Sequence, residues 1–371
     1  MFSEVYRGRR VLVTGGTGFK GSWLCHWLQR LGAHVTCVGL APATEPDAFT
    51  ALRLGERIDS VELDVRDAHA LQACVRDAGP EIVFHLAAQP IVRIAYRDPK
   101  ETFDTNVGGV VNLLEAVRRQ GEIEACVVIT SDKVYENCEW PWGYRESDPL
   151  GGYDPYSASK AAVEIVVSSY RRSYFRGNDA KRIATARAGN VIGGGDWSAD
   201  RIVPDFVRAL VADRPLVLRS PAAVRPWQHV LEPLSGYLWL GACLLGPQGE
   251  QYTDAWNFGP ADDACQPVGT LAELLVRAWG SGTVEIGGGT SGSKEATLLK
   301  LDCSKARATL GWHGVWTLAE AVRHTVRWYQ SYYQRRDMAV IVDTQIAEYA
   351  RTAEVRGVAW TQLPPALPAV A

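Results

Sequence analysis

The stretch RVLVTGGTGFKG, residues 10–21, decides the fold class of this chain. Its first five residues predict a short buried strand, and the amphipathic segment 22–31 after the glycines predicts a helix. Glycines at three-residue spacing between a strand and a helix permit a sharp turn, admit a pyrophosphate and allow close helix–strand packing. We therefore predict a dinucleotide-binding turn, against the alternative of a turn that binds nothing. Its predicted cofactor contacts are Gly15, Thr17, Gly18, Phe19 and Gly21.

Beyond this turn, predicted strands alternate with predicted helices, which is typical of βαβ units and a parallel sheet. The fold class is therefore α/β: a Rossmann-type, doubly wound parallel sheet with a smaller C-terminal substrate-binding lobe. The predicted strands are 10–14, 35–40, 60–63, 82–86, 125–130 and 183–187. The predicted helices are 22–31, 67–77, 103–120, 156–175, 202–212, 268–279, 317–333 and 338–351.

The pattern loosens near residue 190, where prolines, glycines and isolated tryptophans become common. We expect an NAD-binding domain over 1–190 into which later segments interleave, and a nucleotide-sugar-binding lobe over 191–356. The Pro- and Ala-rich segment 357–371 is expected to be a loosely ordered tail.

Composition excludes several classes of protein. The chain has 371 residues, is 47% hydrophobic and carries a net charge of −3, so no global field attracts nucleic acid or an anionic membrane. No apolar run approaches the roughly 18 residues of a membrane span, and no signal peptide is evident. The eight cysteines form no CxxC pair, which favours reduced thiols, a cytoplasmic protein and no metal site.

Tyr156 and Lys160 are the strongest candidates for chemistry. Four residues apart on a predicted helix, they share one face, and the lysine charge is expected to lower the pKa of the tyrosine. Tyr156 can then accept the proton of a hydroxyl that loses hydride, with Ser131 sharing the hydrogen bond. The YxxxK spacing alone is weak, but after a dinucleotide-binding turn it indicates hydride transfer.

Asp132 and Lys133 place an acid and a base side by side at the end of a predicted strand. Adjacent strand residues point to opposite faces, so both can serve one site only if the backbone turns there. The alternative is an ion pair on the protein surface.

NAD is the favoured dinucleotide, although the second strand ends in Gly39-Leu40-Ala41, with neither an acid for a ribose nor an arginine for a 2′-phosphate. Asp64 ends the third strand and could accept from the adenine amino group or, alternatively, cap the next helix. The small residues after His85 would let the cofactor pass close to the backbone. The remaining predicted cofactor contacts are Asp64, Val65, Leu86, Ala87, Ala88, Asn106, Thr130, Tyr156 and Lys160.

Several motifs, taken in order, carry a family resemblance: TGGTGFKGSW, HLAAQP, TSDKVYEN, GGYDPYSASK, ARAGNVIGGGDW, DRIVPD, RPWQHVLEPLSGY and LKLDCSKA. They cover about residues 8–350 and resemble the extended short-chain dehydrogenase/reductase superfamily. More narrowly, they resemble the family of CDP-glucose 4,6-dehydratases, in which Asp-Lys stands where dehydratases of dTDP-glucose and GDP-mannose carry Asp-Glu.

The resemblance implies a lyase that converts CDP-glucose to CDP-4-keto-6-deoxyglucose with bound NAD. Tyr156, helped by Lys160 and Ser131, would remove the 4-hydroxyl proton while C4 gives hydride to NAD⁺. Lys133 would take the C5 proton, Asp132 would protonate the departing 6-hydroxyl, and NADH would return hydride to C6. The predicted substrate contacts are Gln89, Asn190, Arg201, Arg225 and His229, with the two arginines suited to a diphosphate.

The resemblance also implies a homodimer or homotetramer, formed through the helices at 103–120 and 156–175. Two other functions stay open. A nucleotide-sugar epimerase would use the same Tyr-Lys-NAD core but needs no C5 base and C6 acid. A non-catalytic dinucleotide-binding protein could share the fold, although such proteins often lose the Tyr or the Lys.

Overall fold

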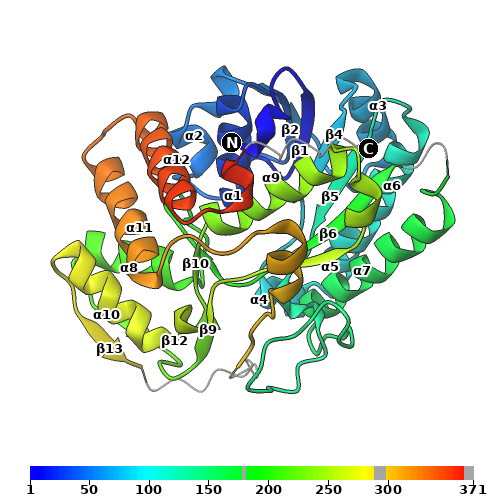
Figure 1. Ribbon diagram of the computed structural model, residues 1–371. Coiled ribbons are helices and arrows are strands. Elements are labelled where there is room, and N and C mark those ends of the chain that lie inside the picture. Colours follow the sequence, from blue (N-terminus) through cyan, green and yellow to red (C-terminus); the bar gives the residue numbers. More distant parts are fainter. Residues whose placement is uncertain (178–180, 288–297, 363–371) are drawn as a thin grey trace.

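A seven-stranded parallel sheet forms the centre of the molecule, with strand order β11-β6-β5-β4-β1-β2-β3 (Figure 1). The computed structural model describes residues 1–177, 181–287 and 298–362. The predicted α/β, doubly wound fold class is confirmed. The strands are β1 (Arg10–Thr14), β2 (His34–Gly39), β3 (Asp59–Glu62), β4 (Ile82–His85), β5 (Ala125–Ile129), β6 (Arg182–Ala188) and β11 (Ala255–Phe258).

Helices cover both faces of the sheet because alternate strand residues point to opposite sides. In β1, for example, Val11 and Val13 enter one core and Leu12 enters the other. The first core contains residues of α1 (Phe19–Arg30), α9 (Leu231–Leu245), α11 (Leu318–Tyr333) and α12 (Met338–Val355). The second contains residues of α3 (Ala68–Ala78), α6 (Gly109–Arg119) and α7 (Pro155–Ser173).

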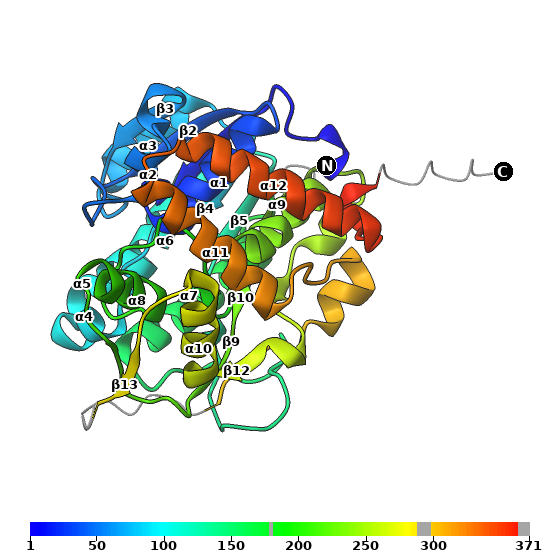
Figure 2. The same cartoon turned by 90° about the vertical axis from the view of Figure 1, so that its left-hand side faces the viewer.

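The second half of the chain forms a smaller lobe below the carboxyl ends of the strands (Figure 1). Its helices are α8 (Ile202–Val211) and α10 (Val268–Trp279). Its short strands pair as β7 (Val191–Ile192) with β10 (Gln228–His229), β8 (Leu216–Leu218) with β13 (Val284–Ile286), and β9 (Val224–Pro226) with β12 (Cys265–Pro267). From this lobe the chain returns through α11 to α12, and α12 lies beside α1 (Figure 2).

One predicted helix, 103–120, is in fact three elements. The chain forms α5 (Pro99–Phe103), a π-helical turn over Asp104–Gly108, and then α6. The wider turn contains Asn106, whose side chain donates to the carbonyl of Gln89 and accepts from its N–H. This long-range contact is invisible to helical periodicity, which explains the difference.

The first part of the predicted loose tail is packed onto the core. Trp360 is fully buried and stacks on Phe2 at 5.0 Å between ring centroids and on Tyr349 at 5.7 Å. The expectation is therefore wrong for residues 357–362, because two aromatic rings bury this segment. Residues 363–371 lie outside the described part of the chain.

The remaining elements are short. They are α2 (Ala48–Ala51), α4 (Val92–Arg97), a π turn over Ala306–Leu310, and 3-10 turns over Phe2–Glu4, Leu54–Glu56, Asp132–Val134, Gly249–Tyr252, Asp262–Ala264 and Ala359–Thr361. All eight cysteines are free thiols. Within the described ranges, no helix has both the length and the apolar character needed to cross a bilayer.

Candidate active site

A cavity of about 390 Å³ lies between the carboxyl ends of the strands and the smaller lobe. Ligands of open α/β sheets bind at this edge, where the strand order reverses, here between β1 and β4. The predicted site residues that line the cavity are Phe19, Thr130, Ser131, Asp132, Lys133, Tyr156, Asn190, Arg201 and Arg225. Residues more than 60 positions apart in the chain therefore meet in one space.

The glycine turn has the conformation that the spacing predicts. Gly15 has φ +71°, and a Cβ there would lie 2.6 Å from the backbone nitrogen of Ala87. A Cβ on Gly21 would lie 2.1 Å from the carbonyl oxygen of Gly15, so helix and turn could not pack as they do. Gly18 is exposed at the start of α1 and has no side-chain cap. These features fit a pyrophosphate held by the helix N-terminus.

Two residues beside the turn have defined contacts. The hydroxyl of Thr17 donates to the carbonyl of Leu40 at 2.9 Å and so ties the turn to the end of β2. Leu86, Ala87 and Ala88 follow β4, where the N–H of Leu86 donates to the carbonyl of Thr14 at 3.0 Å. Their place beside Gly15 leaves them suited to contact a dinucleotide.

At the adenine end, Asp64 pairs with Arg66 at 2.5 Å, and this contact holds the pKa of the carboxyl below its usual value. Asp64 does not cap the following helix: Asp67 is the N-cap of α3. The capping alternative for Asp64 is therefore wrong, and its contact with adenine stays a prediction. Val65 is buried and limits the space beside Gly109.

Tyr156 and Lys160 lie on the first turns of α7 and are both almost fully buried. Burial raises the pKa of Tyr156 to about 12, and the hydrogen bond with Ser131 opposes that rise. Burial, with the nearby charge of Lys20, lowers the pKa of Lys160 to about 7. The ammonium of Lys160 donates to the carbonyl of Ile129 at 3.2 Å.

The pKa of Tyr156 was expected to be lowered by Lys160. In the protein without bound ligands it is raised instead. Desolvation disfavours both charged forms, the phenolate of Tyr156 and the ammonium of Lys160, and it is the largest cause of both pKa shifts. A cation brought by a ligand would lower the Tyr156 pKa, since an opposite charge nearby favours the phenolate.

The backbone turns at Asp132 and Lys133, as a shared role of these residues requires. A 3-10 turn spans Asp132–Val134, and the hydroxyl of its N-cap, Ser131, accepts from the N–H of Lys133 at 3.2 Å. Both side chains line the cavity. Burial raises the pKa of Asp132, while Lys133, Ser131 and Arg225 oppose the rise. A carboxyl with this environment suits a proton donor.

Residues 11–252 match the NAD dependent epimerase/dehydratase family, and this match spans most of the turn, the cavity wall and α7. The chain belongs to the NAD dependent epimerase/dehydratase family. This membership confirms the predicted family resemblance and NAD as the cofactor.

Individual members of this family are similar over nearly the whole chain. A CDP-glucose 4,6-dehydratase of Salmonella typhimurium is 45% identical over 348 residues, covering 93% of this chain and 97% of that protein. A dTDP-glucose 4,6-dehydratase of Streptomyces antibioticus is 31% identical over 333 residues, covering 86% and 92%.

Solved structures agree on the fold. The dTDP-glucose 4,6-dehydratase of Streptomyces venezuelae, with NAD bound, is 25% identical with a TM-score of 0.74 and covers 89% of this chain and 99% of that chain. The UDP-glucose 4-epimerase of Thermotoga maritima is 23% identical with a TM-score of 0.75, covering 87% and 99%, and shows the shared fold alone.

Three residues predicted to contact the substrate or the cofactor are not among those that line the cavity, namely His229, Gln89 and Asn106. His229 is fully buried between Trp23 and Trp316, and its Nδ1 accepts from the N–H of Leu231 at 3.3 Å. A direct substrate contact by His229 has no support in these contacts, because aromatic rings enclose it. Gln89 is buried against Thr102.

Asn106 likewise has a structural position. Its amide nitrogen donates to Ser159 at 2.8 Å, and its other polar contacts are with the backbone of Gln89. It therefore ties the chain after β4 to α7, the helix that carries Tyr156 and Lys160. A direct contact of Asn106 with the cofactor has no support in these contacts.

Two groups of cavity residues were not predicted from the sequence. Lys20 lines the cavity, and burial together with Arg201 lowers its pKa to about 8. Its place within the glycine turn was the available signal. Arg93 and Asp200 both line the cavity and form an ion pair at 2.8 Å. They lie 107 residues apart, and no local pattern connects them.

Proposed function

We propose that this chain converts CDP-glucose to CDP-4-keto-6-deoxyglucose. The observation that carries the proposal is the turn at Asp132 and Lys133, which brings an acid and a base into the cavity that contains Tyr156. An enzyme that only oxidises and reduces C4 has no need of this second pair. The similarity to a CDP-glucose 4,6-dehydratase over 93% of the chain supports the same substrate.

The residues of the cavity divide the work into an oxidation and an elimination. Tyr156 accepts the proton of the sugar 4-hydroxyl, which Ser131 holds by a hydrogen bond. The 4-ketone makes the C5 proton acidic, and Lys133 removes it. Asp132 protonates the 6-hydroxyl, which leaves as water. Burial favours the protonated form of Asp132 before that step.

The turn around Gly15, Gly18 and Gly21, with the residues after β4, would hold the dinucleotide. When bound there, NAD⁺ would supply the hydride acceptor for C4 and, once reduced, the hydride for C6. Asn190, Arg201 and Arg225 lie in the cavity wall and would bind the nucleotide-sugar diphosphate. Arg201 is held by Asp196 at 2.8 Å, which orients the guanidinium.

A homodimer is proposed through α6 and α7. Ile165, at the middle of α7, is 61% exposed in one chain. An apolar side chain this exposed on a long helix favours burial against a second copy.

The test is mass spectrometry after incubating the purified protein and catalytic NAD⁺ with CDP-glucose, dTDP-glucose, UDP-glucose and GDP-mannose in separate reactions. Loss of one water from CDP-glucose alone is the expected result. Unchanged mass in all reactions would reject dehydration of these sugars. Chromatography of the same samples for an isomer of equal mass would then identify an epimerase.

A further inference from the structure

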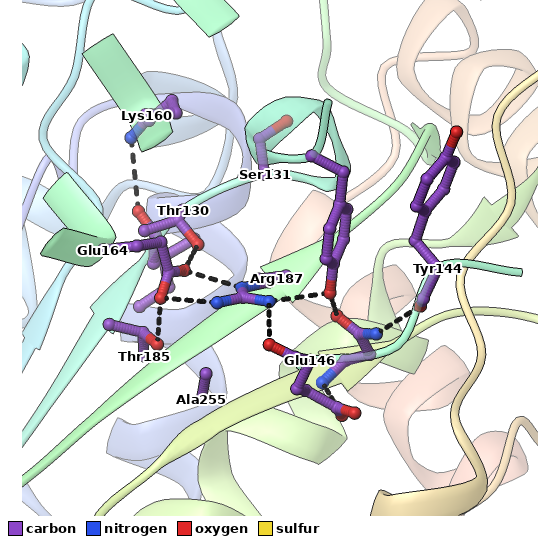
Figure 3. A network of polar contacts seen from close by, with 12 residues as sticks. Thr130, Ser131, Tyr144, Glu146, Lys160, Glu164, Thr185, Arg187 and Ala255 are labelled. Atoms are coloured by element: carbon purple, nitrogen blue, oxygen red, sulfur yellow. Dashed lines mark hydrogen bonds and ion pairs between the residues drawn. The ribbon is translucent and has the colours of Figure 1, made fainter. Parts of the chain in front are cut away.

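Glu164 is a buried carboxylate on α7 that the proposed chemistry does not use. Its side chain is 1% exposed, and four donors meet it from three other residues (Figure 3). Thr130 donates its hydroxyl at 2.5 Å and Thr185 donates at 2.7 Å. Arg187 donates from Nε and Nη2, each at 2.9 Å, in a bidentate pair. Every oxygen of the carboxylate is thus engaged.

These contacts fasten α7 to the end of β5 at two points, one helical turn apart. Lys160 donates to the carbonyl of Ile129, and Glu164 accepts from the hydroxyl of the next residue, Thr130. The chain then continues into Ser131, Asp132 and Lys133. Any shift of Thr130 relative to α7 would move this turn relative to Tyr156.

Arg187 extends the connection to the other end of the same turn. Its Nη1 donates to the hydroxyl of Tyr135 at 2.7 Å, and its guanidinium lies 5.0 Å from the centre of that ring. Tyr135 immediately follows the turn over Asp132–Val134, and its own hydroxyl donates to Asn257 on β11 at 2.7 Å. The Glu164–Arg187 pair therefore holds the segment from Ser131 to Val134 at both ends, through Thr130 before it and Tyr135 after it.

We propose that Glu164 and Arg187 are positioning residues that hold the Ser131–Lys133 turn against α7, so that the oxidation and elimination groups face one substrate. This inference rests on the proposed dehydration. Neither residue touches the cavity itself; Thr130 and the turn connect the pair to it.

Glu164 also affects the protonation of Lys160. The carboxylate of Glu164 raises the pKa of Lys160, opposing the effect of burial. Replacing Glu164 with glutamine would remove this negative charge and leave the Arg187 cation nearby. The pKa of Lys160 then falls further, so any rate limb that depends on protonated Lys160 moves to lower pH.

Glu232 provides a matched control, since it is equally buried but does not line the cavity. Its carboxylate accepts from the N–H groups of Val315 and Trp316 at 2.8 and 2.6 Å and from the hydroxyl of Tyr349 at 2.8 Å. Glu164→Gln and Glu232→Gln make the same chemical change at similar burial. A purely structural role for Glu164 could change the stability of Glu164→Gln, but it would leave the kcat and the pH profile of this variant equal to those of Glu232→Gln.

The experiment compares wild type, Glu164→Gln and Glu232→Gln with the nucleotide sugar that the wild type converts. We expect kcat of Glu164→Gln to fall about a hundredfold with little change in KM, because a misplacement of about 1 Å costs that much. Elimination should slow more than oxidation, since Asp132 and Lys133 lie on the released turn. In a single turnover the variant should therefore accumulate reduced cofactor and the undehydrated 4-ketone.

Each outcome bears on one proposal. A wild type that dehydrates no nucleotide sugar rejects the proposed function. An active wild type with equal kcat and equal pH profiles for the two glutamine variants overturns the positioning role. If Glu164→Gln does not fold, Thr130→Val removes one of its hydrogen bonds while keeping the pair with Arg187. That variant should show a smaller accumulation of reduced cofactor, and normal coupling of the two steps would reject the inference.

Discussion

Ser131 donates its hydroxyl to the carboxylate of Asp132 at 2.9 Å, between two neighbours in the chain. The same oxygen accepts from the N–H of Lys133, and Ser131 also opposes the rise in the pKa of Tyr156. Ser131 is therefore the point at which the oxidation group and the elimination pair meet. One hydroxyl can orient all three because the chain turns immediately after β5.

Tyr156→Phe should abolish dehydration while leaving the fold intact. The phenol supplies the proton acceptor for C4 oxidation, so we expect kcat to fall by roughly 10²–10⁴-fold. Tyr333→Phe, at the exposed end of α11, is the control and should keep wild-type activity. A Tyr156→Phe protein with more than a tenth of the wild-type rate, about 1.4 kcal/mol, would contradict the role.

Lys133→Met should separate the two stages of the reaction. The variant keeps Tyr156 and Lys160, so oxidation at C4 proceeds, whereas exchange of the C5 proton with deuterated solvent is lost. Mass spectrometry of the recovered sugar measures that exchange, and Lys100→Met, on an exposed lysine, is the control. If Lys133→Met exchanges the C5 proton at the wild-type rate, Lys133 is not the base. Its remaining role would then be to stabilise the charge of the enolate.

Lys160→Met should lose activity yet gain stability at low pH. Burial lowers the pKa of Lys160 from 10.5 to about 7 in the folded protein. Folding therefore disfavours the ammonium of Lys160. Stability that is present above the pKa of this lysine in the unfolded chain is lost as the pH falls through its pKa in the folded protein. Relative to wild type, the variant should gain about 1–4 kcal/mol near neutral pH and below. Chemical denaturation at several pH values checks this, and an equal or lower stability would oppose it.

Glu232→Gln should remove one pH-dependent part of the stability. Burial raises the pKa of Glu232 from 4.5 to about 7, so its stabilisation is present below the unfolded pKa and is lost as pH rises to about 7. The variant should therefore gain stability relative to wild type over this range, by at most about 3 kcal/mol. Paired unfolding curves measure the difference, and a constant offset across the range would show that the pKa is not raised.

Ile165→Asp should disrupt self-association. If α6 and α7 pair with a second copy, a carboxylate at this position is buried without a partner and weakens the contact. Size-exclusion chromatography with light scattering should then show a smaller species than wild type. Val340→Asp, on the exposed side of α12, is the control with similar exposure. An unchanged oligomer for Ile165→Asp would place the interface elsewhere.

The sequence by itself determined the elements whose signals are local. The strand, the glycine spacing and the following helix lie within 21 residues, and backbone sterics alone require Gly15 at its positive φ. The placement of Tyr156 and Lys160 on one face of a helix follows from helical periodicity, and the alternation of strands and helices predicts the parallel sheet. Helix α10 begins and ends at the predicted residues, 268 and 279.

Only the tertiary structure decided which of these residues meet and in what environment. Glu164 and Arg187 are 23 residues apart, and their pairing depends on the alignment of α7 with β6. His229 is excluded from the cavity by two tryptophans that are distant in sequence. The raised pKa of Tyr156 arises from desolvation, which depends on everything packed around the ring. Burial and long-range contact are properties of the packed chain as a whole, so local sequence patterns do not contain them.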